Sequence, residues 1–589
     1  MSHIIRDAPV WQVLRLLTGN RILKYPEEED DFRLPETWTQ LLNPDNSGSI
    51  SPQPSNVQQA SSSTSDDEEK QQNKAEAALA RTKSREETVP NTTARLEVDQ
   101  QHELEKTKSI PIVPRRTQEG AILVDWYYTD DAANPQNWSN LRRGLVAYII
   151  CTYTFVVYTS SAIYTTSEEG VIEAFGVSMT AASLGLALFV LGYGVGPLLF
   201  SPLSELPSIG RNPVYIWTMF SFVIVSIPAA LVQNFPGLMV LRFLQGFFGS
   251  PCLANGAASF GDMYSMMALP YAMIAWVSAA YCGPALGPLL SGFSVPAKGW
   301  RWSLLEILWA AAPVFVAMFL FLPETSTPNL LLRRAQRLRK LTGSSRFMSQ
   351  SEIDERNLDR RAVLISALIK PLEITVKDPA ILFVQVYTAI IYGIYYSFFE
   401  VFPLVYPVYY GMNYGQIGLL FLCIMVACLL GVVVYMSYLY FYMDPRVRAR
   451  GFPVQETRLV PALIAAFGPT IGLFIFAWTA RPDIHWIAPT IGITIYGATV
   501  FVVMQCIFVY VPLSYPQYAA SLFAGNDFFR SALAFASILF AKPLFENLGV
   551  ARGTTLLGGL STFGIVGIWV LYFYGAKLRS LSKFAVASD

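Results

Sequence analysis

Hydrophobic residues gather into twelve long runs between residues 144 and 574 of the chain. Each run has about 20 residues or more, the length that an α-helix needs to cross the hydrocarbon core of a bilayer. The runs cover residues 144–165, 180–203, 213–233, 238–259, 270–293, 303–322, 380–404, 416–440, 459–480, 486–511, 520–544 and 555–574. Because only helices and closed barrels satisfy their backbone polar groups in lipid, this pattern predicts twelve membrane-spanning helices.

Polar stretches divide the chain into larger parts. Residues 1–142 form a predicted N-terminal tail, of which 44–118 is rich in serine, glutamine and acidic residues, a composition typical of disorder. The other predicted parts are a six-helix half over 143–322, a basic linker over 323–378, a six-helix half over 379–575 and a C-terminal tail over 576–589. The expected fold class is an all-α membrane protein with twelve transmembrane helices in two six-helix halves and a long, largely disordered cytosolic N-terminal tail.

The segment 10–25 has apolar residues at helical spacing with basic residues nearby, which predicts an amphipathic helix. It either lies on an anionic leaflet or docks on the cytosolic face of the protein itself.

Basic residues indicate how the helices are oriented. The linker 323–378 holds eleven Lys and Arg against seven Asp and Glu, and Arg446, Arg448 and Arg450 follow the eighth run. The connectors on the other side are mostly acidic or uncharged. Since cytosolic loops carry an excess of Lys and Arg, both termini are predicted to be cytosolic.

The composition and the motifs argue against a soluble protein, a nucleic-acid-binding protein and an enzyme. The chain is 53% hydrophobic and 15% charged, whereas soluble domains are about 25% charged. Its formal net charge of zero gives no reason to expect a nucleic-acid partner. The chain has no P-loop, no CxxC pair, no metal-ligand cluster and no nucleophile–base pair in its polar segments. We therefore expect no enzyme, no catalytic residue, no metal site and no bound cofactor.

Charged residues inside the predicted spans or at their ends are the candidates for coupling transport to a proton gradient, because a charge in hydrocarbon is costly and usually faces a polar path. These candidates are Glu400, Arg242, Asp262, Asp527 and Arg530. Glu400 lies among aromatic residues, where a desolvated carboxyl can exchange a proton near neutral pH. The alternatives are a permanently protonated Glu400, an Arg242 that snorkels to the interface, and a purely structural Asp527–Arg530 pair.

Three further groups of residues suggest a moving transporter. Glu205, Gly210, Arg211 and Asp262 are predicted to form an inner gate, with a static salt bridge worth about 0–1 kcal/mol as the alternative. Gly283, Pro284, Gly287, Pro288 and Gly292 are predicted to loosen the fifth helix and to let a neighbour pack closely. Tyr153, Gln245, Tyr392, Tyr396 and Phe399 are predicted to line a cavity for flat organic molecules.

Several strings occur in an order that resembles one family. They are RDAPVWQVLRLLTGNRILKYPEEE (6–29), NPQNW (134–138), SPLSELPSIGR (201–211), LRFLQGFFGSP (241–251), GPALGPLLSG (283–292), WRW (300–302), LPET (322–325), LLRRAQRLRK (331–340), FFEVFP (398–403) and NDFFRS (526–531). The chain resembles the fungal twelve-span drug:proton antiporters of the major facilitator superfamily, in the group that confers resistance to fluconazole, benomyl, methotrexate, caffeine or brefeldin. Ser201 stands where the loop motif commonly has glycine, and Ser291 replaces one glycine of the antiporter motif.

The resemblance implies proton-coupled efflux of small apolar or amphipathic compounds by alternating access. It implies that Arg242 takes part in proton coupling. It also implies, through the antiporter motif that ends at Gly292, that compounds are exported in exchange for protons. The expected partners are small organic compounds, protons and the lipid bilayer, and the plasma membrane is expected rather than the vacuole. The alternatives are an exporter of one endogenous metabolite such as a toxin or polyamine, a nutrient symporter, and a membrane sensor or scaffold. The oligomeric state is left open.

Overall fold

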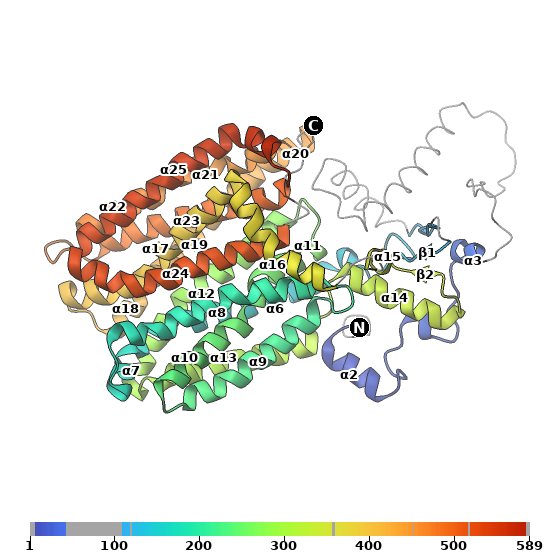
Figure 1. Ribbon diagram of the computed structural model, residues 1–589, viewed down its shortest axis with the longest axis horizontal. Helices are drawn as coiled ribbons and strands as arrows, with labels where there is room; N and C mark the ends of the chain where they lie inside the picture. Colours follow the sequence, from blue (N-terminus) through green and yellow to red (C-terminus); the bar gives the residue numbers. More distant parts are fainter. Residues whose placement is uncertain are drawn as a thin grey trace.

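The computed structural model describes residues 6–42, 109–117, 120–355, 360–451, 453–515 and 519–584. These residues contain twelve helices that are long and apolar enough to cross a membrane, and they lie side by side in one bundle (Figure 1). Each of the twelve predicted hydrophobic runs overlaps one of these helices, so the predicted number and order of the spans are confirmed.

The first six spans come from one half of the chain. They are α6 (Asn140–Ala162) with η3 (Thr165–Ser167) and α7 (Glu168–Phe175), α8 (Met179–Glu205), α9 (Arg211–Leu231), α10 (Phe235–Gly249) with α11 (Pro251–Met263), α12 (Leu269–Lys298) and α13 (Arg301–Phe321). The fourth span is divided after Gly249 because Pro251 has no N–H to continue the helical ladder.

The other six spans follow the linker. They are α17 (Pro379–Tyr410), α18 (Tyr414–Leu420) with α19 (Leu422–Tyr438), η4 (Leu439–Met443) and α20 (Asp444–Arg450), η5 (Gln455–Leu459) with α21 (Val460–Ala465) and α22 (Phe467–Thr479), α23 (Ile487–Ser514), α24 (Ala519–Leu548) and α25 (Val550–Leu581). Gly411 ends α17 with a φ of 64°, a left-handed conformation that glycine adopts without steric cost.

The two halves meet along two pairs of membrane spans: α8 packs on α24, and α12 packs on the span formed by α18 and α19. Glycines permit these contacts: a methyl group on Gly194 of α8 would lie 2.3 Å from Cβ of Ser531, and one on Gly292 of α12 would lie 2.6 Å from the carbonyl oxygen of Tyr414. The interface between the halves is therefore close-packed at backbone level.

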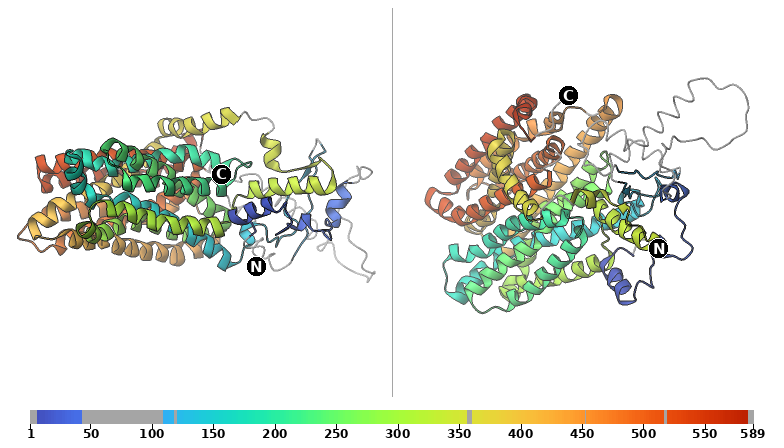
Figure 2. Two further views of the ribbon diagram at one scale, coloured as in Figure 1. Left: turned by 90° about the horizontal axis from the view of Figure 1, so that it is seen from below. Right: turned by 45° about the vertical axis from the view of Figure 1, so that its right-hand side comes forward.

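The remaining elements lie at one end of the bundle, which we call the linker end; the opposite end is the far end (Figure 1). They are α2 (Pro9–Leu17), η1 (Pro26–Glu28), α3 (Glu36–Leu42), β1 (Ile122–Leu123), η2 (Pro135–Asn137), α14 (Thr327–Thr342), β2 (Phe347–Met348), α15 (Gln350–Glu355) and α16 (Arg360–Lys377). Figure 2 shows the N-terminal segments beside α14.

The N-terminal segments and the linker share a small hydrophobic core. Strand β1 pairs in parallel with β2, so that Ile122 lies opposite Phe347. The buried members of the core are Trp38, Ile122, Val124, Tyr127, Ala335, Leu338 and Phe347. The association of these two distant segments was not predicted from the sequence.

Part of the segment predicted to be disordered belongs to this assembly. Pro111 and Arg116 form bridges with Tyr128 and Ile122. Residues 44–108 and 118 lie outside the described residues. Of the predicted amphipathic helix over 10–25, Pro9–Leu17 form α2, which contacts α13 and α9.

Glu27 ties the N-terminal segment to α14. It accepts hydrogen bonds from Tyr127 Oη at 2.9 Å and Arg337 Nε at 3.0 Å, and its carboxylate lies 3.4 Å from Arg334 Nε. Burial alone would raise the pKa of Glu27, but the guanidinium groups of Arg337 and Arg334 hold it below its ordinary value of 4.5.

A carboxyl with a lowered pKa stabilises the folded state above its unfolded pKa, and this contribution is lost as the pH falls through the folded pKa. We therefore expect Glu36–Leu42 to lose hydrogen-exchange protection progressively as the pH falls below the ordinary carboxyl pKa of 4.5. Glu27→Gln should show the loss already at neutral pH. Equal protection of the variant and the parent at neutral pH would contradict this role for Glu27.

Candidate functional site

A small cavity lies between the two halves. Its volume is about 60 Å³ and its walls are largely aromatic and aliphatic. It is lined by Tyr158, Leu253, Trp276, Val277, Ala280, Tyr281, Pro284, Ile391, Tyr392, Tyr395, Val500, Met504, Phe508, Phe523, Asp527 and Arg530. Since pockets for drug-sized ligands usually measure about 300–1,000 Å³, the halves must separate before such a ligand can enter.

The cavity contains one buried ion pair. Asp527 and Arg530 lie three residues apart on α24, and Arg530 Nη2 is 2.5 Å from Asp527 Oδ1. The guanidinium of Arg530 lies 4.5 Å from the ring centre of Tyr392. Within the described residues its Nε has no hydrogen-bond partner. The predicted pairing is therefore present, and it leaves a donor that a ligand could use.

Polar contacts between the halves close both sides of the cavity. Toward the far end, Tyr193 of α8 contacts the hydroxyl of Tyr392 and donates to Tyr396 Oη at 3.0 Å. Toward the linker end, Tyr271 of α12 donates to Asp444 Oδ2 at 2.8 Å. The cavity therefore lies between two sets of polar contacts that join the halves.

Of the predicted cavity residues, only Tyr392 lines the cavity. Tyr396 lies behind it, with its hydroxyl 3.2 Å from Ser161 Oγ. Tyr153 donates to the Gly249 carbonyl oxygen at 2.9 Å inside the first half.

Two further predicted cavity residues have other partners. Gln245 donates to Ser226 Oγ at 2.9 Å, and Phe399 stacks on Phe421 with ring centres 5.0 Å apart. Their helix faces point toward neighbouring helices, and residue type alone does not reveal this direction.

Helices α12 and α23 contribute aromatic residues to the cavity that were not predicted from the sequence, among them Trp276, Tyr281 and Phe508. One signal could have found the wall from α12. Val277, Ala280, Tyr281 and Pro284 have the i, i+3, i+4, i+7 spacing of one helix face.

A pair of buried carboxyl groups joins the halves near the far end. Ser183 of α8 donates to Glu168 Oε2 at 3.0 Å and lies 3.5 Å from Glu400 Oε2. Glu168 begins α7 and Glu400 belongs to α17, and the two residues are 3% and 5% exposed. The positive charge of Lys542 on α24 acts on both carboxyls. In the sequence Glu168 belongs to the acidic connector after the first hydrophobic run, and nothing there marks its partner, which is distant in the sequence.

Arg242 is fully buried between α6, α8 and α10. It donates to the carbonyl oxygens of Gly185, Ser160 and Ser161 at 3.0–3.2 Å and to Gln245 Oε1 at 3.1 Å. Its guanidinium also lies over the rings of Tyr164 and Phe189. Arg242 therefore holds three helices of one half together, and it lines neither the cavity nor the bundle surface.

The predicted inner-gate residues lie at the linker end. Arg211 Nε is 2.6 Å from Asp262 Oδ2, so these two residues pair as predicted. Both belong to the first half, so their ion pair joins α9 to α11 rather than one half to the other. Glu205 is exposed.

Gly210 caps α9 with a φ of 81°, and a methyl group there would lie 2.4 Å from Glu324 Oε2. Glu324 itself accepts hydrogen bonds from the backbone N–H groups of Arg211 and Asn212 at 3.1 and 3.2 Å. The turn before α9 is therefore fixed by a buried carboxylate from the end of α13.

The antiporter-like motif packs α12 against two neighbours. A methyl group on Gly283 would lie 2.8 Å from the Phe155 carbonyl oxygen, and one on Gly287 would lie 2.6 Å from the Ile163 nitrogen. Thr159 of α6 donates to the Gly283 carbonyl oxygen at 3.0 Å. Pro288 contacts α18, where a methyl group on Gly418 would lie 2.6 Å from its carbonyl oxygen. The predicted close packing beside these glycines is therefore present.

Gly287→Ala is expected to destabilise the protein by about 1–3 kcal/mol, because the added methyl group would push α12 away from the backbone of α6. Gly261→Ala is the matched control, since its methyl group would meet no atom within 4 Å. The unfolding temperatures of the two variants in detergent measure the difference. Equal temperatures would show that α12 can move aside without cost.

Within the described residues, no group of three or more His, Cys, Asp or Glu side chains could hold a metal ion.

The chain is similar in sequence and in fold to known proteins. The Major Facilitator Superfamily model matches residues 149–541. "MFS-type transporter pyvG" of Aspergillus violaceofuscus is 47% identical over 472 residues, which cover 80% of this chain and 87% of that protein. "Cycloheximide resistance protein" of Candida maltosa is 34% identical over 600 residues, covering 99% of this chain and 100% of that protein.

A solved structure of the peptide transporter POT in complex with sulfate has the same fold. It is 13% identical with a TM-score of 0.53, and the match covers 77% of this chain and 98% of that one. Because the family model matches most of the membrane bundle, the chain belongs to the major facilitator superfamily, among fungal transporters that include a drug-resistance protein.

Proposed function

We propose that the protein exports small apolar or amphipathic compounds across a membrane in exchange for protons, by alternating access of a site between its two halves. The observation that carries the proposal is the aromatic cavity between the halves with its buried Asp527–Arg530 pair. Aromatic walls suit flat apolar compounds, and the unpartnered Nε of Arg530 suits a single acceptor on them. The name of the relative from Candida maltosa also supports drug efflux.

The proton step is assigned to Glu168 and Glu400. Two carboxylates that share the hydroxyl of Ser183 in a buried site repel each other, so at least one should hold a proton while the halves are in contact. Loss of that proton would favour separation of α17 from α7 and α8. The positive charge of Lys542 on α24 weakens the repulsion between the two carboxylates, although Lys542 also lies 3.7 Å from Glu546. A proton can drive the cycle only by binding the two conformations with different affinity.

The orientation follows from charge. The linker end is proposed to be cytosolic because the basic linker and both described ends of the chain lie there (Figure 1). The far end, with the carboxyl pair, would then face outward. We propose the plasma membrane as the location, and the proton gradient as the only energy source.

Efflux measured in proteoliposomes tests the proposal. Purified protein is reconstituted, and cycloheximide and a panel of azoles, benzimidazoles, antifolates and polyamines are loaded as candidate substrates. We expect an imposed pH gradient to accelerate release of several apolar compounds and an uncoupler to abolish the acceleration. Release of one compound alone would favour a dedicated metabolite exporter, and uptake along the proton gradient would favour a symporter. Release at the same rate with and without the gradient would refute proton coupling.

A further inference from the structure

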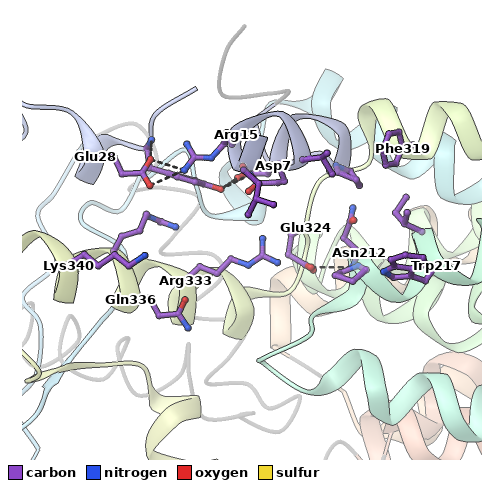
Figure 3. A pocket seen from close by; sticks show the side chains of 18 residues that line it. Asp7, Arg15, Glu28, Asn212, Trp217, Phe319, Glu324, Arg333, Gln336 and Lys340 are labelled. Atoms are coloured by element: carbon purple, nitrogen blue, oxygen red, sulfur yellow. Dashed lines mark hydrogen bonds and ion pairs between the residues drawn. The ribbon is translucent and has the colours of Figure 1, made fainter. Parts of the chain in front are cut away.

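A second, larger pocket opens at the linker end, outside the helical bundle. Its volume is about 530 Å³. The N-terminal segment with α2, the first turns of α9, the end of α13 and one face of α14 form its walls (Figure 3). It is separate from the cavity between the halves, because the two share no lining residue.

One wall of this pocket is a cationic helix face. Arg333, Gln336, Arg337 and Lys340 of α14 line it with the i, i+3, i+4, i+7 spacing of a single face. The opposite face of α14 is held in place by the small hydrophobic core, in which Ala335 and Leu338 are completely buried. Since that core fixes the rotation of α14, the basic face is directed into the pocket.

Most charges in the pocket are already paired. Arg15 Nη2 lies 2.9 Å from the Glu28 carboxylate, and Arg337 Nε lies 3.0 Å from Glu27. Asp7 accepts a hydrogen bond from Tyr25 Oη at 2.7 Å and lies 3.9 Å from an Arg142 nitrogen.

Two cations are left over. No hydrogen bond or ion pair joins Arg333 or Lys340 to another described residue. The positive charge of Arg333 acts on the carboxyl of Glu324, which already accepts hydrogen bonds from the backbone N–H groups of Arg211, Asn212, Thr325 and Ser326. Burial raises the pKa of Glu324. Arg333 and Lys340 are thus available to an added anion, and two helical turns, about 10 Å, separate them along α14.

The other end of the pocket is apolar. Ile216 and Trp217 of α9 and Phe319 of α13 belong to membrane-spanning helices and lie within two turns of their ends. Trp217 is 69% exposed, and Leu16 of α2, which also lines the pocket, is 80% exposed. Figure 3 shows Trp217 and Phe319 at one side of the pocket and Lys340 at the other, with Arg333 between them. The pocket therefore changes from apolar to cationic along the direction that leaves the membrane.

We propose that this pocket binds an anionic phospholipid of the leaflet at the linker end, with its phosphodiester at Arg333, a second anionic headgroup oxygen at Lys340 and its acyl chains on Trp217 and Phe319. A soluble phosphate would satisfy the cations but leave the apolar wall in contact with water, whereas a phospholipid covers both. The bound lipid would join α2 and α14 to the ends of α9 and α13. The proposal rests on the position of the span ends and on no assumption about transported compounds.

Thermal unfolding of the full-length protein in detergent tests the proposal. The probes are dioctanoyl phosphatidylinositol 4-phosphate, dioctanoyl phosphatidylcholine, and the soluble headgroup inositol 1,4-bisphosphate. We expect the phosphoinositide to raise the unfolding temperature with a saturable dose response and the other two to have little effect. Arg333→Gln with Lys340→Gln should weaken the apparent affinity about 10-fold or more, since each cation near an anionic lipid contributes to binding.

Arg450→Gln with Lys577→Gln is the matched control, because both residues are exposed cations at the linker end of the other half. It should respond like the parent, as should the charge-preserving Arg333→Lys with Lys340→Arg. An undiminished response of the Arg333/Lys340 glutamine variant would overturn the proposal. Equal stabilisation by phosphatidylcholine would identify a non-specific detergent effect, and equal affinity for the soluble headgroup would identify a soluble-anion site; either result also overturns it.

Discussion

Glu400→Gln is expected to abolish pH-driven efflux while leaving the protein folded. Glutamine has nearly the shape of a protonated glutamate and can still accept from Ser183, which lies 3.5 Å from Glu400 Oε2. It cannot release a proton, so the repulsion between this position and Glu168 can no longer be switched on. The halves should then remain in contact near the far end regardless of the pH gradient.

The same proteoliposome assay measures this effect, with the unfolding temperature in detergent as the test of folding. Glu168→Gln should impair coupling as well, because it removes the other carboxyl of the pair. Glu173→Gln is the matched control, since Glu173 is an exposed carboxyl at the same end of the bundle. If Glu400→Gln carried out proton-driven efflux at the parent rate, the proposal that Glu168 and Glu400 bind the coupling proton would be wrong.

Asp527→Ala is expected to be strongly destabilising, by about 3–5 kcal/mol, because it leaves the buried guanidinium of Arg530 without its carboxylate. Arg530 is only 5% exposed, and the ring of Tyr392 at 4.5 Å compensates only part of the charge. Replacing both partners, as in Asp527→Ala with Arg530→Met, should recover most of the stability, since no buried charge is then unpaired.

Unfolding temperatures of the parent, the single variant and the double variant measure these differences. The efflux rate distinguishes a loss of function from a loss of stability. The double variant should be folded, but it should export compounds that carry a hydrogen-bond acceptor more slowly, because the Arg530 donor is gone. An unchanged unfolding temperature of Asp527→Ala would contradict this expectation, because it would show that water reaches the Arg530 guanidinium freely.

The membrane architecture could be predicted from the sequence because it depends on local composition. A run of about 20 apolar residues has few stable alternatives to a membrane-spanning helix, so all twelve spans were predicted. Their ends were predicted less well: the first span ends at Phe175 rather than 165, and the eighth at Arg450 rather than 440. The close packing at Gly283 and Gly287 was also predictable, because a missing side chain permits backbone contact whichever helix is the neighbour. The Asp527–Arg530 pair was predictable because residues three apart share a helix face.

Contacts between distant segments were decided by the tertiary structure alone. Glu168 looked like a loop acid until α7 and α17 were placed together, with Ser183 between Glu168 and Glu400. Arg242 donates its hydrogen bonds mainly to backbone carbonyl oxygens of other helices. Every residue has a carbonyl oxygen, so the sequence does not show which ones Arg242 contacts.

The same holds for the ends of the chain and for the cavity. Trp38 and Phe347 belong to one core, although more than half of the chain separates them. Which aromatic residues line the cavity depends on the rotation of each helix, and a span that is apolar all around has no face that its sequence marks as inward. The sequence alone determined that this chain forms twelve membrane helices with small-residue contacts, because those properties are local. Only the tertiary structure decided which polar groups meet, because that depends on how the helices pack.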